Sequence, residues 1–126
     1  MDVRWIILSG EVKTEKDIED CKKNMASMLN NLENWFYISK ASCIITSEEQ
    51  SKTAQVILSA IKDKRTSFIR GIFYDSNYQL SEKIEKEFKD ILLIVDIGTE
   101  INDVKKILSQ IKGKKVVVIY LKGENK

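Results

Sequence analysis

The chain has 126 residues, of which 43% are hydrophobic and 32% charged, a size and composition typical of a single globular domain spanning residues 1–126. Its 21 basic and 19 acidic residues leave a formal net charge of +2, too small to indicate binding to nucleic acid or to an anionic membrane. No apolar run has the length of a membrane span and the first residues lack a signal-peptide cleavage site, so we expect a cytoplasmic, intracellular protein.

The first residues predict a strand followed by a helix. Val3–Leu8 is an apolar run ended by Ser9 and Gly10, typical of a strand and a tight turn. Thr14, with Asp17 three positions later, predicts a helix start. The helix should bury one stripe of residues spaced by three or four, namely Ile18, Cys21, Met25, Met28, Leu29 and Leu32.

A second strand and helix follow the aromatic residues Trp35, Phe36 and Tyr37. Ala41–Thr46 is an apolar run that predicts a buried strand. Ser47–Gln50 has the pattern of a capping box, so a helix is expected to begin there. Its apolar face would carry Ala54, Ile57, Leu58 and Ile61.

The second half of the chain predicts three more strands. Ser67–Tyr74 is expected to be a strand, followed by a polar loop and a short helix carrying Leu80, Ile84 and Phe88. Ile91–Val95 is a continuous apolar run, typical of a strand buried on both faces, and Asp96 and Gly98 lead from it into another helix. The β-branched run Lys115–Leu121 closes the pattern.

Strands that alternate with helices in this way predict an α/β fold with three layers, a mostly parallel sheet between two layers of helices. In such a fold the functional crevice lies beyond the carboxyl ends of the strands. Cys21 and Cys43 do not have the spacing of metal ligands and fit the apolar pattern, so we expect both to be core residues, with no metal and no cofactor.

Three segments resemble the histidine phosphatase superfamily, which includes the phosphoglycerate mutases. Ile6–Glu11 (I-I-L-S-G-E) is similar to the opening L-V-R-H-G-E of that family, and Ile94–Ile101 is similar to its later V-V-S-H-G-G-V-I turn. Between them, Ile45–Ser47 and the following Thr53-Ala54 resemble its S-S-P-x-x-R-A-x-Q-T-A segment. The resemblance implies that the first strand lies beside Ile91–Val95 and that Lys115–Leu121 is an antiparallel edge strand.

The residues that carry the chemistry of that family are replaced here. Ser9 stands at the position of the nucleophilic histidine, Leu8 at the first arginine and Ile97 at the second histidine, while Gln50 and Ser51 stand near the second arginine. The chain has no histidine at all, and a serine without a neighbouring base is a poor nucleophile. The resemblance therefore implies a catalytically inactive domain, a pseudophosphatase, with a relic pocket formed by Leu8, Ser9, Gly10, Glu11, Ser47, Gln50, Asp96, Ile97 and Gly98.

Such a domain would act as an interaction or structural module, with a protein partner or a second copy. Two surfaces are predicted for that contact: the aromatic residues Trp35, Phe36 and Tyr37, of which at least one should point outward, and the edge of the last strand at Val116, Val118 and Tyr120.

The alternative hypothesis is an enzyme of a different class. Ser9 with Glu11 or Asp96 as a base would form an incomplete nucleophilic site. In a second version, Glu11 and Asp96 would share a magnesium ion, and the helix that starts near Gly98 would offer free amides to an anion. On this hypothesis the chain is a small phosphate- or nucleotide-binding, or metal-dependent phosphoryl-transfer, enzyme.

Overall fold

The computed structural model describes residues 2–32, 34–38, 41–62, 70–72, 90–111 and 115–123. In chain order they form β1 (Asp2–Ser9), α1 (Glu15–Leu32), β2 (Ser42–Ile45), α2 (Lys52–Lys62), β3 (Arg70–Ile72), β4 (Asp90–Val95), α3 (Ile101–Ser109) and β5 (Lys115–Lys122). The short helix predicted around Leu80, Ile84 and Phe88 lies outside the described residues. The other predicted strands and helices are present, with changed bounds.

The described strands form one sheet in the order β1-β5-β4-β2-β3, and every neighbouring pair is parallel. Strand β5 lies between β1 and β4, with Ile119 paired to Ile6 on one side and to Ile94 on the other. The prediction of an antiparallel edge strand at Lys115–Leu121 is therefore wrong, and so is the placement of the first strand beside Ile91–Val95. The burial of β5 explains its position, because Val116–Ile119 are fully buried and such runs occupy the interior of parallel sheets.

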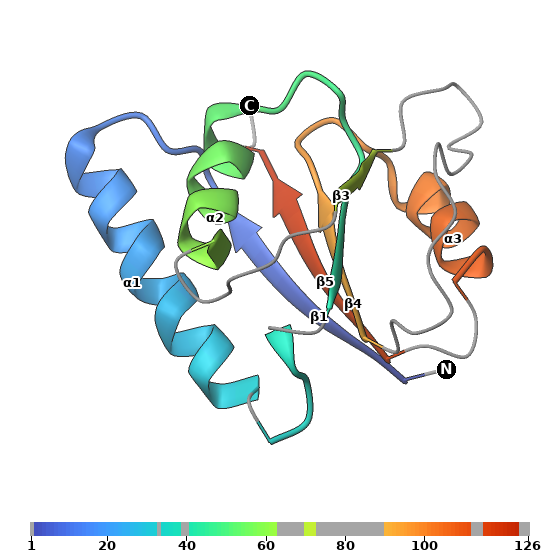
Figure 1. Ribbon diagram of the computed structural model, residues 1–126. Helices are drawn as coiled ribbons and strands as arrows, with labels where there is room; N and C mark the ends of the chain where they lie inside the picture. The colour runs from blue at the N-terminus through green and yellow to red at the C-terminus, as the bar shows by residue number, and fades with distance from the viewer. Residues whose placement is uncertain are drawn as a thin grey trace.

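Helices cover both faces of the sheet, as Figure 1 shows, with α1 and α2 on one side and α3 on the other. Alternate residues of the central strands divide into two apolar clusters. Cys43, Leu92 and Val117 pack towards α1 and α2, whereas Ile44, Leu93 and Val118 pack towards α3. This division confirms the predicted three-layer arrangement and explains why β2, β4 and β5 are buried on both faces.

The two predicted helix starts have different outcomes. At α1 the capping box is confirmed, because Thr14 Oγ1 accepts a hydrogen bond from the Asp17 amide at 3.1 Å and Asp17 Oδ2 accepts one from the Thr14 amide at 2.9 Å. At α2 the prediction is wrong: the hydroxyl of Ser47 donates to the carbonyl of Glu49 within a turn, and the helix begins only at Lys52. Ser51 is its N-cap residue.

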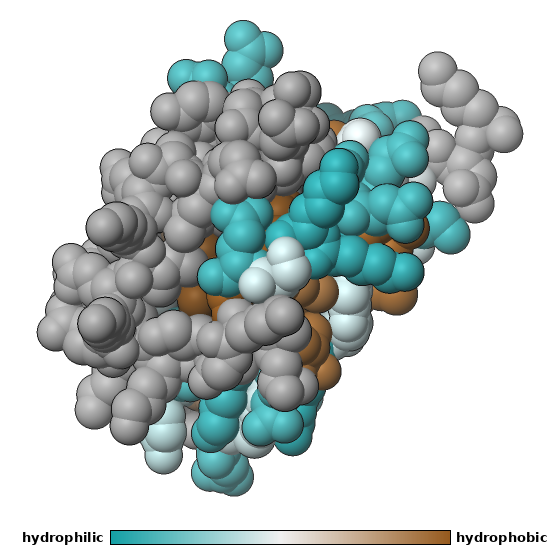
Figure 2. Space-filling model, turned by 90° about the vertical axis from the view of Figure 1, so that its right-hand side faces the viewer, coloured by the Kyte–Doolittle hydropathy of each residue, from teal (hydrophilic) through white to brown (hydrophobic). Residues whose placement is uncertain are grey.

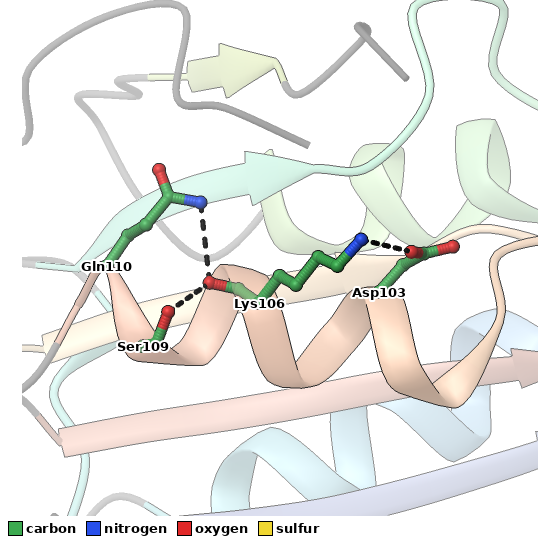
Figure 3. A network of polar contacts seen from close by, with 4 residues as sticks. All are labelled: Asp103, Lys106, Ser109 and Gln110. Carbon is green, nitrogen blue, oxygen red and sulfur yellow. Dashed lines mark hydrogen bonds and ion pairs between the residues drawn. The ribbon is translucent and has the colours of Figure 1, made fainter. Parts of the chain in front are cut away.

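Helix α3 buries Val104 and Ile107 and turns a polar side to the surface. Figure 3 shows that polar side: Lys106 forms an ion pair with Asp103 at 3.7 Å, and the carbonyl of Lys106 accepts hydrogen bonds from Ser109 and Gln110. Figure 2 shows the α3 side of the molecule, where hydrophobic residues are visible at the surface between hydrophilic ones. Within the described segments, no helix combines the length and the apolar character needed to cross a membrane.

Candidate functional site

The carboxyl ends of β1, β2, β4 and β5 meet at one edge of the sheet, because these strands are parallel. The Gly10 amide donates to the carbonyl of Lys122 at 3.2 Å, which joins the ends of β1 and β5. A side-chain carbon at Gly123 would lie 3.2 Å from Cγ2 of Ile97 and 3.7 Å from Oε1 of Glu11. The loops after β1, β4 and β5 therefore approach one another closely at this edge.

Asp96 organises the end of β4. The residue is 2% exposed, and its carboxylate accepts three hydrogen bonds: from the Ser51 amide at 2.8 Å, from the Ser51 hydroxyl at 2.5 Å and from the Ile97 amide at 2.7 Å. The Ser51 hydroxyl oxygen in turn accepts the Ala54 amide at 3.1 Å, inside the first turn of α2. A buried carboxylate is stable only when hydrogen bonds replace its water, so this network fixes the start of α2 against the end of β4.

Two buried threonines extend the same network. The Asp96 amide donates to Thr46 Oγ1 at 2.9 Å, and the hydroxyls of Thr46 and Thr99 lie 2.9 Å apart. The Thr99 amide donates to the carbonyl of Asp96 at 3.2 Å. The part that Ser51 and Thr99 play in holding this edge was not predicted from the sequence. For Ser51 the available signal was a hydroxyl residue directly before a helix, whereas Thr99 stands two residues before α3 and no local pattern marks it.

A cavity of about 240 Å³ opens beside this network. Its walls come from the loop after β1, the loop after β2, the first turn of α2 and the end of β4. The lining residues are Glu11, Val12, Ser47, Glu49, Ser51, Lys52, Thr53, Asp96 and Ile97.

A neighbouring cavity of about 250 Å³ lies between the end of β1 and helix α1. It is lined by Leu8, Ser9, Gly10, Glu11, Val12, Asp17, Asp20, Cys21, Asn24, Met25 and Thr53. The two cavities share Glu11, Val12 and Thr53. The Val12 amide donates to Thr53 Oγ1 at 3.0 Å, so this pair of residues ties the loop after β1 to α2 between the cavities.

The residues predicted for a relic pocket are divided between these cavities. Leu8, Ser9 and Gly10 line the one beside α1, whereas Ser47, Asp96 and Ile97 line the one beside α2, and Glu11 lines both. Gln50 and Gly98 line neither of the two. Ser9 and Ile97 therefore do not face each other across one crevice. Strand β5 lies between β1, which ends at Ser9, and β4, which precedes Ile97.

Glu11 and Asp96 do line one cavity, as the metal hypothesis requires. The Asp96 carboxylate, however, uses both oxygens in hydrogen bonds within the protein. Among the described residues there is no group of three or more acidic, cysteine or histidine side chains that could hold a metal ion. The geometry gives no support to a metal shared by Glu11 and Asp96.

Two groups on the wall of the cavity beside α1 have shifted pKa values. The amides of Thr14 and, to a lesser extent, Lys13 donate to the Asp17 carboxylate and lower its pKa, because they stabilise the charged form. Burial raises the pKa of the Cys21 thiol. Neither cysteine forms a disulfide: Cys43 is buried, as predicted, and Cys21 is half-buried.

The residues predicted as an interaction surface are also divided. Phe36 is buried against Trp35, with ring centres 6.1 Å apart, whereas Tyr37 is 57% exposed, which confirms that at least one aromatic ring points outward. Val116 and Val118 are fully buried in the interior strand β5. Tyr120 is half-buried on the same strand. The prediction of a free strand edge at these three residues is wrong.

The fold resembles that of phosphoribosyltransferases. Two crystal structures of a hypoxanthine phosphoribosyltransferase from Staphylococcus aureus superpose on 87% of this chain, in an orthorhombic form with a TM-score of 0.55 and 21% identity and in a tetragonal form with a TM-score of 0.51 and 19% identity. The chain covers 63% of those structures, slightly less than two thirds of their length. No protein-family model matches the sequence, and no curated protein does. At this identity the likeness establishes the fold alone.

The comparison corrects the family prediction. The structures similar to this chain are phosphoribosyltransferases, so the prediction of a degenerate histidine phosphatase similar to the phosphoglycerate mutases is wrong. The prediction of a pseudophosphatase without enzymatic activity is wrong with it. It depended on the absence of the histidines that carry the chemistry of the histidine phosphatases, and the similar structures are enzymes of another class.

Proposed function

We propose that the chain is a small enzyme that binds a nucleotide or sugar phosphate, with the phosphate group in the 240 Å³ cavity at the start of α2, and transfers a phosphorylated group. One observation carries the proposal: this cavity lies at the carboxyl edge of a parallel sheet and is lined by the first residues of a helix. Phosphates bind at such helix starts because the amides there lack partners within the helix and carry partial positive charge.

The first turn of α2 supplies the donors. The carbonyl and the hydroxyl of Ser51 accept the amides of Gln55 and Ala54, which are the first hydrogen bonds of the helix. The amides of Lys52 and Thr53 precede them and have no acceptor within the helix. The Lys52 side chain adds a full positive charge to the cavity wall. Together these groups can surround one phosphate with charge-assisted hydrogen bonds.

The acidic side chains set the orientation of the ligand. Three carboxylates line the same cavity. That of Asp96 is bound by Ser51 and Ile97, whereas those of Glu11 and Glu49 repel a phosphate and accept hydrogen bonds from uncharged hydroxyls. The phosphate therefore belongs at Lys52 and the hydroxyls of a sugar near Glu11 and Glu49. A volume of about 240 Å³ is smaller than the pockets of drug-sized ligands, which have about 300–1,000 Å³. It suits a sugar phosphate, and a base attached to the sugar would extend past Glu11 into the second cavity.

The transfer of a phosphoribosyl group is the reaction that the fold comparison favours, because the similar structures are hypoxanthine phosphoribosyltransferases. That part of the proposal is an analogy between folds. The proposed position of the phosphate is argued from the cavity and from Lys52, and it does not depend on the analogy.

Binding can be measured by calorimetry and by NMR shift perturbation with ribose 5-phosphate, inorganic phosphate and inosine 5′-monophosphate, which joins hypoxanthine to a phosphoribosyl group. We expect binding that Lys52→Ala weakens by roughly 10-fold to 100-fold, the effect of losing one charge-assisted hydrogen bond. Lys105→Ala is the matched control, because Lys105 is an exposed lysine on α3, away from the cavity. Absence of binding by all three ligands, or equal affinities in the two variants, contradicts the proposed site.

Activity is a separate test. Formation of a nucleotide from an activated phosphoribosyl donor and hypoxanthine or another purine base, lost in Lys52→Ala and kept in Lys105→Ala, would support transfer. If the protein binds the ligands but does not catalyse this reaction, the phosphate site is supported and the proposed phosphoribosyl transfer is contradicted.

A further inference from the structure

Strand β1 is an open edge of the described sheet. It has eight residues, Asp2–Ser9, and pairs with β5 along its whole length. It is the terminal strand in the sheet order. The side of β1 turned away from β5 therefore presents backbone amides and carbonyls that can receive another strand.

This edge carries exposed apolar side chains. Ile7 is 62% exposed and Trp5 is 41% exposed, two of the most exposed large hydrophobic residues in the described part of the chain. On β5, Trp5 pairs with Val118 and Ile7 with Tyr120. Val118 packs in the cluster below α3, so Trp5 and Ile7 lie on the same face of the sheet as α3. Trp5 rests against Tyr120, with ring centres 6.2 Å apart. The apolar layer below α3 thus continues to the edge of the sheet and stops there uncovered.

The edge lacks the usual protection against pairing. Natural edge strands are commonly guarded by lysine, proline or an inward-pointing charge. The chain contains no proline, and the single charge between Val3 and Leu8 is Arg4. The Arg4 guanidinium lies 4.1 Å from the centre of the Trp35 ring, on the opposite face from Trp5 and Ile7, and is held there by a cation–π contact. Apart from Asp2 at its first position, the strand therefore carries no charge that is free to oppose a second strand.

We infer that β1 pairs antiparallel with β1 of a second copy of this chain, about a two-fold axis at Ile6. An axis at Ile6 places Trp5 opposite Ile7 of the second copy, and the reverse, so the exposed apolar side chains of both copies become cross-strand neighbours on one face. Arg4 then lies opposite Leu8, and no like charges oppose one another. An axis at Ile7 would place Trp5 opposite Ser9 and lose this match.

The self-complementarity of β1 selects a second copy as the occupant. The exposed residues Trp5 and Ile7 are two positions apart on one face. With a two-fold axis between them, Trp5 of each copy would be buried against Ile7 of the other. The two sheets would join into one continuous sheet. The inference does not depend on the proposed function, because it concerns the outer side of β1 and no residue of the cavity beside α2.

The association state tests the inference. Sedimentation velocity and light scattering over a wide concentration range should show a dimer that Ile7→Lys and Trp5→Lys each convert to monomer, with native circular dichroism. Tyr37→Lys and Ile101→Lys are matched controls, because they replace side chains that are 57% and 46% exposed elsewhere on the surface, and both should remain dimers. If Ile7→Lys misfolds, Ile7→Thr probes the same contact with a β-branched polar residue.

Cross-linking tests the register. In a Cys21→Ser background, mild oxidation of a mixture of Trp5→Cys and Ile7→Cys proteins should give a disulfide-linked heterodimer at several times the yield of either protein alone. A wild-type protein that is monomeric at high concentration overturns the inference. So does a dimer that survives Ile7→Lys, whether or not Tyr37→Lys disrupts it. A dimer that depends on Ile7 but gives no excess of the mixed cross-link overturns the pairing about Ile6.

Discussion

Asp96 and Ser51 are joined by two hydrogen bonds, from the Ser51 amide to Asp96 Oδ2 at 2.8 Å and from the Ser51 hydroxyl to Asp96 Oδ1 at 2.5 Å. The same hydroxyl oxygen accepts the Ala54 amide at 3.1 Å, so its own proton points to Asp96. The N-cap of α2 is therefore oriented by a buried carboxylate at the end of β4. Any ligand held by the first turn of α2 depends on this contact for the position of its donors.

Replacing Asp96 tests the strength of that contact. Asp96→Ala removes the acceptor of three hydrogen bonds and leaves buried donors without partners, so we expect the free energy of unfolding to fall by about 3 kcal/mol. Urea denaturation measures the change. Asp103→Ala is the control, since Asp103 forms a single ion pair with Lys106 at the surface and should lose less than about 1 kcal/mol. Equal losses in the two variants would show that the Asp96 network adds no stability.

Two glycines at the same edge should respond differently to alanine. Gly98 has φ +94° and open space around a side-chain carbon, so Gly98→Ala should destabilise by about 1–2 kcal/mol through backbone strain alone. At Gly123 the side-chain carbon would lie 3.2 Å from Cγ2 of Ile97, so Gly123→Ala acts by crowding. A double-mutant cycle measured by denaturation separates the two: Ile97→Ala should relieve Gly123→Ala and leave the loss at Gly98→Ala unchanged. Coupling of Ile97 to both glycines, or to neither, would contradict this assignment.

The sequence predicted the layers because burial pattern is a local property. Ile91–Val95 reads as a strand buried on both faces and is one, and the stripe ending in Met25, Leu29 and Leu32 is the buried side of α1. The strand order was not predictable in the same way. The apolar run Val116–Leu121 indicates that β5 is buried, but it does not indicate which strands lie beside it. The strand order implied by the resemblance placed β5 at the edge of the sheet.

The candidate site was predicted only as a region. Parallel strands bring their carboxyl ends together, and Glu11, Ser47 and Asp96, which follow three different strands, line one cavity at that edge. The start of α2 was misplaced because Ser47–Gln50 satisfies the capping pattern locally. The contact that moves the cap to Ser51 comes from Asp96, 45 residues away, and no local pattern contains it.

The two cysteines should differ in reactivity. Burial raises the pKa of Cys21 from its ordinary value of 9.0, and the thiolate is the reactive form, so iodoacetamide should modify it more slowly than a cysteine in the unfolded chain. Cys43 has no exposed surface and should be modified only after unfolding. Mass spectrometry of peptides from a labelling time course, with and without urea, measures both rates. Labelling of Cys43 at the rate of Cys21 in the folded protein would show that β2 opens readily.

The capping box of α1 should make stability depend on pH in the acid range. The amides of Thr14 and Lys13 lower the pKa of Asp17 below its ordinary value of 3.8. Because the folded pKa lies below the unfolded one, the charged carboxylate stabilises the folded protein at any pH above 3.8, and this contribution is lost as the pH falls through the folded pKa. Wild type should therefore be more stable than Asp17→Asn at neutral pH, and the difference should vanish in acid.

Urea denaturation of both proteins at a series of pH values measures that difference, and an NMR titration of the Asp17 carboxyl carbon gives the pKa directly. Thr14→Val separates the sources of the shift: it removes the hydroxyl that caps α1, at a loss of about 1 kcal/mol, but keeps the backbone amides that are the main cause of the low pKa. The Asp17 pKa should therefore stay below 3.8 in Thr14→Val. A return to 3.8 would show that the threonine hydroxyl, and not the backbone, holds the carboxylate in its charged form.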